Sequence, residues 1–142
     1  MPGSVPRLSG ILETSLYVDD IDRSRRFYED LFGFVTIFQD DRMCAMEIPE
    51  EQVLLLFRHG MTDRPAPGPD GFIPPHHGRG AALHLAFAIP LRELAAWEEH
   101  LHAHGVPIES RLVWPKGGTS LYFRDPDGHS LEVATPGLWP NR

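Results

Sequence analysis

The chain has 142 residues, of which 42% are hydrophobic and 23% charged, and its formal net charge at pH 7 is −7. This length suits one domain, 1–142, and the acidic excess argues against nucleic-acid binding, which depends on Lys and Arg. No apolar run could span a bilayer and no basic-then-apolar leader precedes the domain, so no membrane partner is expected. The single cysteine, Cys44, cannot form an internal disulfide, which fits a cytoplasmic location.

The first half of the chain, 8–58, is predicted to form one β-α-β-β-β module. A strand is expected near 11–18. Asp20 is a typical N-cap and Gly33 a typical stop for the amphipathic helix between them. Runs of apolar and β-branched residues predict the remaining strands near 34–39, 42–48 and 52–58.

Residues 59–80 differ from the rest of the chain, because they hold five Pro and five Gly in 22 positions. A segment of this length is too long for a plain connector, and loops of this kind are often lids or binding loops. Two interpretations remain open: a loop that crosses the mouth of a site, or a passive linker.

The second half, 81–135, repeats the order of the first. A strand over Leu83–Ile89 precedes a helix at about 91–104, which Gly105 ends. Three further strands are expected near 107–113, 119–124 and 129–134, and the last two are joined by the turn sequence Asp125-Pro126-Asp127-Gly128. The prediction is an α+β fold of paired βαβββ modules that form a curled mixed sheet around a cavity.

Glu13, His84 and Glu132 each lie in a short apolar run that is predicted to be a strand. Glu13 and His84 occupy matching places in the two halves, 71 positions apart, and Glu132 lies in the last strand. Two carboxylates and an imidazole could hold one divalent metal ion and leave positions free for a substrate. The counterpart of Glu132 in the first half falls at about Leu55, which cannot bind a metal, so three protein ligands are expected.

Strand alternation extends this hypothesis to neighbouring residues. Residues two apart share a face of a strand, so Ser15 and Tyr17 should face the cavity with Glu13 and contact the substrate. The residues that would flank His84 and Glu132 on the same face are small, which leaves room for a ligand: Ala82, Ala86, Ala88, Ser130 and Ala134.

Three stretches together resemble the vicinal-oxygen-chelate superfamily, which includes glyoxalase I, extradiol dioxygenases, fosfomycin-modifying enzymes and bleomycin-resistance proteins. They are Leu16-Tyr17-Val18-Asp19-Asp20-Ile21-Asp22-Arg23-Ser24 with Phe27-Tyr28, Leu83-His84-Leu85-Ala86-Phe87, and Ser120-Leu121-Tyr122-Phe123-Arg124-Asp125-Pro126-Asp127-Gly128-His129 ending at Glu132. The resemblance covers roughly 10–135. It implies a homodimer, with metal sites that in several members are shared between subunits.

The resemblance assigns the ligands position by position. His84 and Glu132 match second-half metal ligands, and Glu13 stands where most members have His. The implied cofactor is a divalent ion (Mn, Fe, Ni, Mg or Zn), although many members have lost their metal. Leu55 stands where glyoxalase I has a carboxylate that serves in proton transfer, which counts against ordinary glyoxalase I activity.

The resemblance also suggests residues that contact the substrate. Tyr122 is similar to a substrate-facing tyrosine of fosfomycin-modifying members and is a candidate catalytic residue beside Glu132, with core packing as the alternative. Ser120 is similar to an anion-binding residue of the same members. Arg58 could meet an anionic substrate or could mark a solvated strand end.

Two functions follow from these assignments. The first is a metal-dependent enzyme, an isomerase, lyase or dioxygenase, that acts on a small oxygen-rich organic substrate. The second is a metal-free binding protein that sequesters a small toxic compound, as bleomycin-resistance proteins do.

Overall fold

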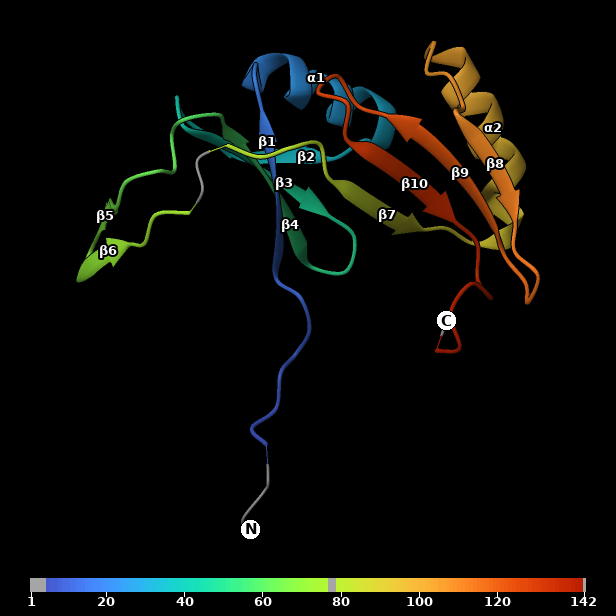
Figure 1. Ribbon diagram of the computed structural model, residues 1–142, viewed down its shortest axis with the longest axis horizontal. Coiled ribbons are helices and arrows are strands. Elements are labelled where there is room, and N and C mark those ends of the chain that lie inside the picture. The colour runs from blue at the N-terminus through green and yellow to red at the C-terminus, as the bar shows by residue number, and fades with distance from the viewer. Residues whose placement is uncertain (1–4, 77–78, 142) are drawn as a thin grey trace.

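The computed structural model describes residues 5–76 and 79–141. Its elements follow the predicted order twice (Figure 1). The first module contains β1 (Glu13–Val18), α1 (Ile21–Phe32), β2 (Val35–Gln39), β3 (Met43–Ile48) and β4 (Gln52–Arg58). The second contains β7 (His84–Ala88), a 3-10 turn (Leu91–Glu93), α2 (Leu94–Ala103), β8 (Ser110–Val113), β9 (Thr119–Arg124) and β10 (Ser130–Ala134).

The two modules have the same sheet topology. The strand orders are β1-β4-β3-β2 and β7-β10-β9-β8, and in each sheet the first two strands are parallel while the others are antiparallel. Ser15 lies opposite Leu55 on β4, just as Ala86 lies opposite Glu132 on β10. The register therefore makes Leu55 the structural counterpart of Glu132, as the repeat predicted.

Helix α1 begins and ends at the predicted residues. The Asp20 carboxylate accepts a hydrogen bond from the Arg23 backbone N–H, which satisfies one of the free donors of the first turn. Gly33 ends the helix with φ 71°, in the left-handed region that Gly adopts without a Cβ clash. The apolar face of the helix is buried by Ile21, Tyr28 and Leu31.

The modules join on the side of the sheets that carries the helices. The Tyr28 hydroxyl donates to the Asp125 carboxylate at 2.7 Å, and the Ser24 hydroxyl donates to Asp127 at 3.0 Å. Both acceptors belong to the turn between β9 and β10. One hydrophobic cluster runs through both modules around these bonds, with Tyr28, Phe123 and Leu131 fully buried. The predicted turn is therefore also the joint between the modules.

The structure confirms the α+β class and the curled mixed sheets. It differs in closure: each module forms its own four-stranded sheet, and among the described residues no ladder joins a strand of one to a strand of the other. A cavity closed by one continuous sheet is therefore not built within a single chain. The 59–80 segment also contains an unpredicted hairpin, β5 (Ala66–Gly68) and β6 (Gly71–Ile73), which projects to one side of the first sheet (Figure 1).

Within the described ranges, neither helix is both long enough and apolar enough to cross a bilayer.

Candidate metal centre

One face of the second sheet gathers the predicted second-half residues. Glu132 lies opposite Tyr122 on β9, and the next pair along the ladder brings Ala134 opposite Ser120. His84 lies opposite Ser130 on the parallel side of β10. Directly opposed residues share a face, and alternate residues of a strand return to it. His84, Glu132, Tyr122 and Ser120 therefore project from the same face.

His84 and Glu132 are in contact within one chain. The His84 Nε2 atom lies 3.2 Å from Glu132 Oε1, and the Glu132 side chain is 5% exposed whereas that of His84 is 52% exposed. Nitrogen and oxygen ligands each lie about 2.1 Å from a bound zinc ion, so two ligands of one ion are separated by roughly 3 Å. The observed spacing fits two donors of a single cation.

The tautomer of His84 strengthens this fit. Its Nδ1 lies 2.9 Å from the Ser130 backbone oxygen, which can only accept, so Nδ1 carries a proton and donates it. In a neutral ring Nε2 then holds a lone pair directed at the Glu132 carboxylate. Two acceptors at this distance need a proton or a metal ion between them, and a metal ion bound by both atoms would satisfy this need.

The other carboxylate oxygen of Glu132 is already bonded. Ser120 is fully buried, and its hydroxyl donates to Glu132 Oε2. The Trp114 indole Nε1–H in turn donates to the Ser120 oxygen at 2.9 Å. Ser120 thus holds the Glu132 carboxylate through Oε2, and Oε1 faces His84.

Tyr122 lies beside this pair. Its ring stacks loosely on His84, with centroids 6.2 Å apart and planes 27° apart. Burial, and then the negative charge of Glu132, raise the pKa of the Tyr122 phenol above its ordinary value. The hydroxyl therefore stays protonated at neutral pH and is a hydrogen-bond donor rather than a base.

A hollow of about 240 Å³ lies beside Ala86, Ala88 and Ala134, and Leu138 and Trp139 of the C-terminal segment form a wall. Three of the small side chains expected beside the ligands border this open space, whereas His84 and Glu132 do not line it.

Glu13 does not complete the site within one chain. It is exposed on β1, in the first sheet, and the described residues contain no group of three His, Cys, Asp or Glu side chains that could hold one ion. The chain thus brings together His84 and Glu132 without Glu13. The three-ligand set stays a prediction that requires a Glu13 from elsewhere.

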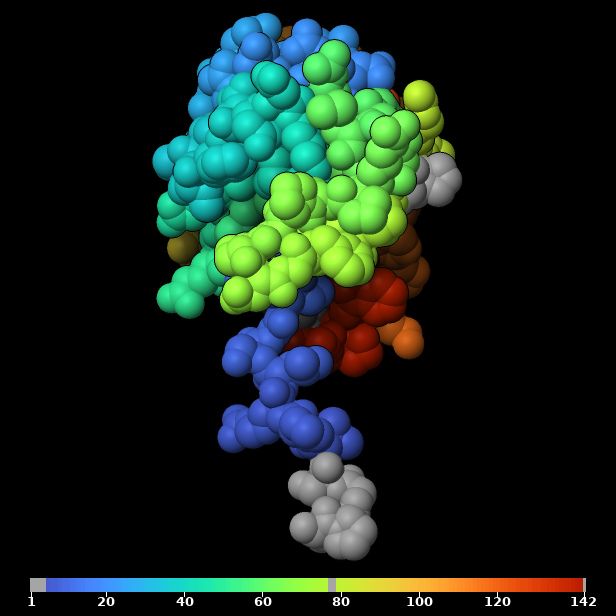
Figure 2. All heavy atoms as spheres, turned by 90° about the vertical axis from the view of Figure 1, so that its left-hand side faces the viewer, coloured from blue at the N-terminus to red at the C-terminus, as the bar shows by residue number. Residues whose placement is uncertain are grey.

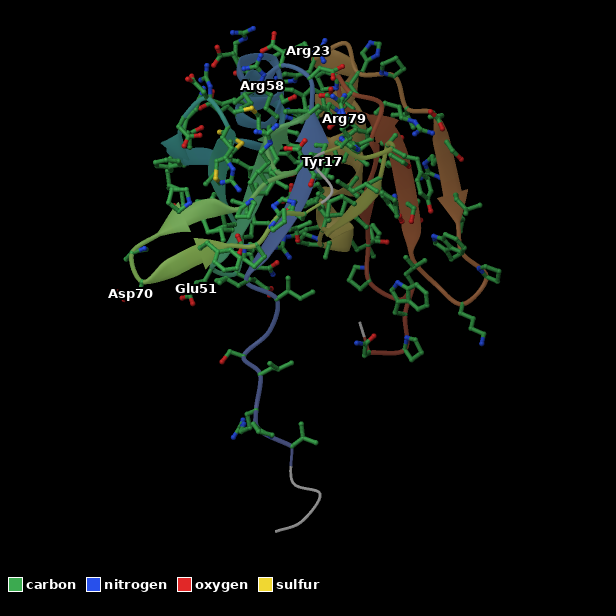
Figure 3. The ribbon with its side chains drawn as sticks, turned by 60° about the vertical axis from the view of Figure 1, so that its left-hand side comes forward. Tyr17, Arg23, Glu51, Arg58, Asp70 and Arg79 are labelled. Atoms are coloured by element: carbon green, nitrogen blue, oxygen red, sulfur yellow. The ribbon has the colours of Figure 1, made fainter. Side chains whose placement is uncertain are left out.

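Tyr17 is covered by the connecting segment. Its hydroxyl lies 2.8 Å from the Thr62 hydroxyl and 2.6 Å from His76 Nδ1, and its ring stacks on His59. A Cβ on Gly80 would lie 2.8 Å from the Tyr17 ring, so only Gly allows the chain to pass there. Figure 3 locates Tyr17 on β1, and Figure 2 shows the segment, green to yellow-green, lying in front of the first module.

Arg58 and Ser15 have different positions. Ser15 is exposed on the face of β1 that carries Glu13 and Tyr17. Arg58 lies opposite Val18, so it projects from the other face, and it borders an acidic hollow with Asp20 and Asp41. Figure 3 places it near the end of the first sheet, beyond Tyr17. Of the two interpretations of Arg58, the geometry fits the solvated strand end.

Sequence reasoning missed Trp114, Thr62 and His76. Their contacts are with residues 6, 45 and 59 positions away, and no periodic pattern marks such pairs. His76 lies in an exposed part of the connecting segment, and its ring bonds Tyr17 and packs on Phe57. His77 lies outside the described residues.

Two matched modules and a His–Glu donor pair on an open sheet face define a protein of the vicinal-oxygen-chelate type. Residues 10–133 match the family model of the Glyoxalase/Bleomycin resistance protein/Dioxygenase superfamily, and the chain belongs to that superfamily.

Relatives within the superfamily carry several different activities in their names. A crystal structure of lactoylglutathione lyase from Agrobacterium tumefaciens is 34% identical, covers 95% of this chain and 99% of its own, and superposes with a TM-score of 0.84. The metallothiol transferase FosB of Bacillus licheniformis is 26% identical over 91% of this chain and 77% of its own length. The catechol-2,3-dioxygenase of Bacillus subtilis is 26% identical over 83% of this chain, which spans 38% of that enzyme.

Proposed function

We propose that this protein is a divalent-metal-dependent enzyme that acts on a small oxygen-rich organic substrate. One observation carries the proposal: His84 Nε2 and Glu132 Oε1 face each other at 3.2 Å while His84 Nδ1 donates to a backbone carbonyl. This arrangement leaves a lone pair and a carboxylate oxygen directed at one point, which is how two ligands of a metal ion are held.

The proposed third ligand is Glu13 from a second copy of the chain. Glu13 is exposed on an open sheet face, and the outer edge strands carry exposed apolar residues that a second copy could cover. Val35, Ile37 and Phe38 are more than half exposed on β2, and so is Val113 on β8. Two carboxylates and one imidazole would neutralise a divalent ion and favour harder metals such as Mn, Fe(II), Mg or Ni.

Each residue of the proposed site would have a separate role. His84 and Glu132 hold the ion, which when bound supplies a Lewis acid for adjacent substrate oxygens. Tyr122, kept protonated by its raised pKa, donates a hydrogen bond to a substrate oxygen that gains negative charge. Ala86, which lies opposite Glu132, and Ala134 border a hollow that would give the substrate space.

The apolar residue Leu55 limits the kinds of reaction that the proposed site can support. The position opposite Ser15 is 9% exposed and apolar, so it cannot carry a proton as a carboxylate there would. The site is thus better suited to chemistry that needs one stabilised oxyanion, such as addition of a thiol or opening of a ring, than to a proton shuttle that needs carboxylates at both the Leu55 and the Glu132 positions.

Metal analysis of the purified protein tests the proposal. We expect one divalent ion per chain after dialysis, and loss of most of it in His84→Ala and in Glu132→Gln. Matched controls are His102→Ala and Glu99→Gln, both exposed on α2, which should retain the metal. Thermal unfolding of each variant shows whether it is folded.

Absence of metal from the folded wild-type protein would refute the enzyme and favour the sequestering function instead. That alternative predicts tight binding of a cationic glycopeptide that Glu132→Gln leaves unaffected in the absence of metal. With metal present, assays of a thiol with an epoxide, of a thiohemiacetal and of a catechol in air would identify the reaction.

A further inference from the structure

We infer that Ser120 and Trp114 are positioning residues that hold Glu132 as a ligand through one oxygen. This inference rests on the proposed metal site and adds two residues that orient its ligand Glu132 through hydrogen bonds. Neither needs to touch the metal or the substrate. The indole of Trp114 orients the hydroxyl of Ser120, and that hydroxyl orients the carboxylate.

The direction of each hydrogen bond follows from the chemistry of the donors. An indole Nε1–H can only donate, so at 2.9 Å the Ser120 oxygen must accept from Trp114. An ionised carboxylate can only accept, so the single Ser120 proton goes to Glu132 Oε2. The chain of bonds thus has one polarity, from indole to hydroxyl to carboxylate.

Burial makes this arrangement rigid. Ser120 is fully buried and Glu132 is 4% exposed, so water does not compete for these bonds. A hydrogen bond to a charged group is worth about 1.5–3 kcal/mol, and inside the protein it is stronger than in water. Trp114 is itself held in a tight turn, because its backbone N–H donates to the Gly118 oxygen and its carbonyl accepts from Gly117.

The consequence concerns how many coordination positions the carboxylate occupies. With Oε2 held by Ser120, Oε1 is the carboxylate oxygen that faces His84. A carboxylate without that bond can rotate and bind an ion through both oxygens, which occupies a position that a substrate would need. Ser120 and Trp114 would therefore set both metal affinity and the open position. The Ser120 proton is then committed to Glu132 and is not available to a substrate.

The test combines metal affinity with a spectroscopic readout. Partners of metal ligands typically contribute 10- to 100-fold to affinity, so Ser120→Ala should weaken Mn(II) binding by about that factor in a chelator competition. Ser120→Thr keeps a hydroxyl and should therefore retain the Mn(II) affinity of the wild type. Trp114→Phe should weaken Mn(II) binding less than Ser120→Ala does. In a double variant, Trp114→Phe should cause no loss of affinity beyond that of Ser120→Ala, because Trp114 acts only through the Ser120 hydroxyl. Trp97→Phe, whose ring packs on Phe32, is the matched control.

Two further measurements separate the possible failures. In metal-free protein, the Trp114 indole proton resonance should move upfield in Ser120→Ala, and the EPR spectrum of the Mn(II)-loaded variant should differ from that of the wild type. Wild-type protein that binds none of Mn(II), Fe(II), Ni(II) and Mg(II), with the indole shift intact, refutes the proposed function and leaves the hydrogen-bond chain standing. Equal Mn(II) affinity and equal spectra in wild type and Ser120→Ala overturn the positioning role itself.

Discussion

Backbone groups that can only donate or only accept a hydrogen bond orient the side chains around His84. The Ser130 carbonyl can only accept, and it fixes the proton of His84 on Nδ1. His129 follows the same logic: the Leu83 N–H donates to its Nδ1 at 2.8 Å, so its Nε2 carries the proton and donates to the Tyr17 carbonyl at 2.7 Å. Both histidines are thus held in defined tautomers by the backbone.

Tyr122 provides a direct test of the electrostatics of this face. Burial raises its pKa first and the charge of Glu132 second, so Glu132→Gln should lower the Tyr122 pKa toward its ordinary value without restoring it fully. Alkaline titration of metal-free protein with isotope-labelled tyrosine, followed by NMR, measures this. Glu109→Gln, which removes only the exposed partner of Arg124, is the control. An identical Tyr122 titration in Glu132→Gln and wild type would disprove the assignment.

The joint between helix α1 and the β9–β10 turn depends on a buried phenol. Burial, together with the charge of Asp125, raises the pKa of Tyr28 well above its ordinary value. The folded protein therefore keeps this proton when the unfolded chain loses it, and the unfolding free energy falls as the pH rises above about 10.

Tyr28→Phe should change this dependence. The variant loses a hydrogen bond to a carboxylate and should be about 1–3 kcal/mol less stable at neutral pH, with a smaller loss of stability in alkali. Ser24→Ala removes the neighbouring bond to Asp127 but no titrating group, so it should be destabilised with the wild-type alkaline slope. Urea unfolding at neutral and alkaline pH distinguishes the two. Equal alkaline slopes for Tyr28→Phe and wild type would show that another group is responsible.

The connecting segment is fastened to β1 through Tyr17. Thr62 is 1% exposed, and its hydroxyl bonds the Tyr17 phenol, while its backbone oxygen accepts from the His76 N–H. Thr62→Val keeps the shape and removes the hydroxyl. It should raise amide hydrogen exchange in β5 and β6 by an amount that corresponds to about 1 kcal/mol of local stability.

Exchange in α1 should be unchanged in that variant. Thr36→Val, which removes a hydroxyl bond to Glu29 in the first module, is the matched control and should leave exchange in β5 and β6 as in the wild type. If Thr62→Val exchanges like the wild type, the segment is held by its other contacts, such as the stacking of His59 on Tyr17.

The protein as a whole presents two open sheets, each with donor groups on one face. Glu13 belongs to one sheet, and His84 and Glu132 belong to the other. The proposed three-ligand site would therefore need two chains, and the exposed apolar residues of β2 and β8 are edges that a second copy could cover. This arrangement predicts complementation between defective chains.

Glu13→Ala and His84→Ala proteins should each bind little metal, whereas a mixture that has been unfolded and refolded together should regain it. Each mixed dimer would contain one site with both defects and one site with none, because the two sites draw Glu13 and His84 from opposite chains. Metal content after gel filtration measures the recovery. A mixture that binds no more metal than its components would show that Glu13 is not shared between subunits.

The sequence by itself determined the βαβββ repeat, the ends of α1, the β9–β10 turn, and which residues flank Glu132 on its own face of the strand. Caps, turns and strand alternation are set by residues close together in the chain, and local geometry allows few alternatives. The correspondence of Leu55 with Glu132 also followed, because a repeated pattern carries its register with it.

Only the tertiary structure decided which donors meet. It bonded Trp114 through Ser120 to Glu132, fastened Thr62 and His76 to Tyr17, and left Glu13 on a separate sheet. These contacts depend on which strands pair, how tight turns direct a side chain, and how two sheets lie relative to each other. Such properties are sums over many distant interactions, and no short stretch of sequence contains them.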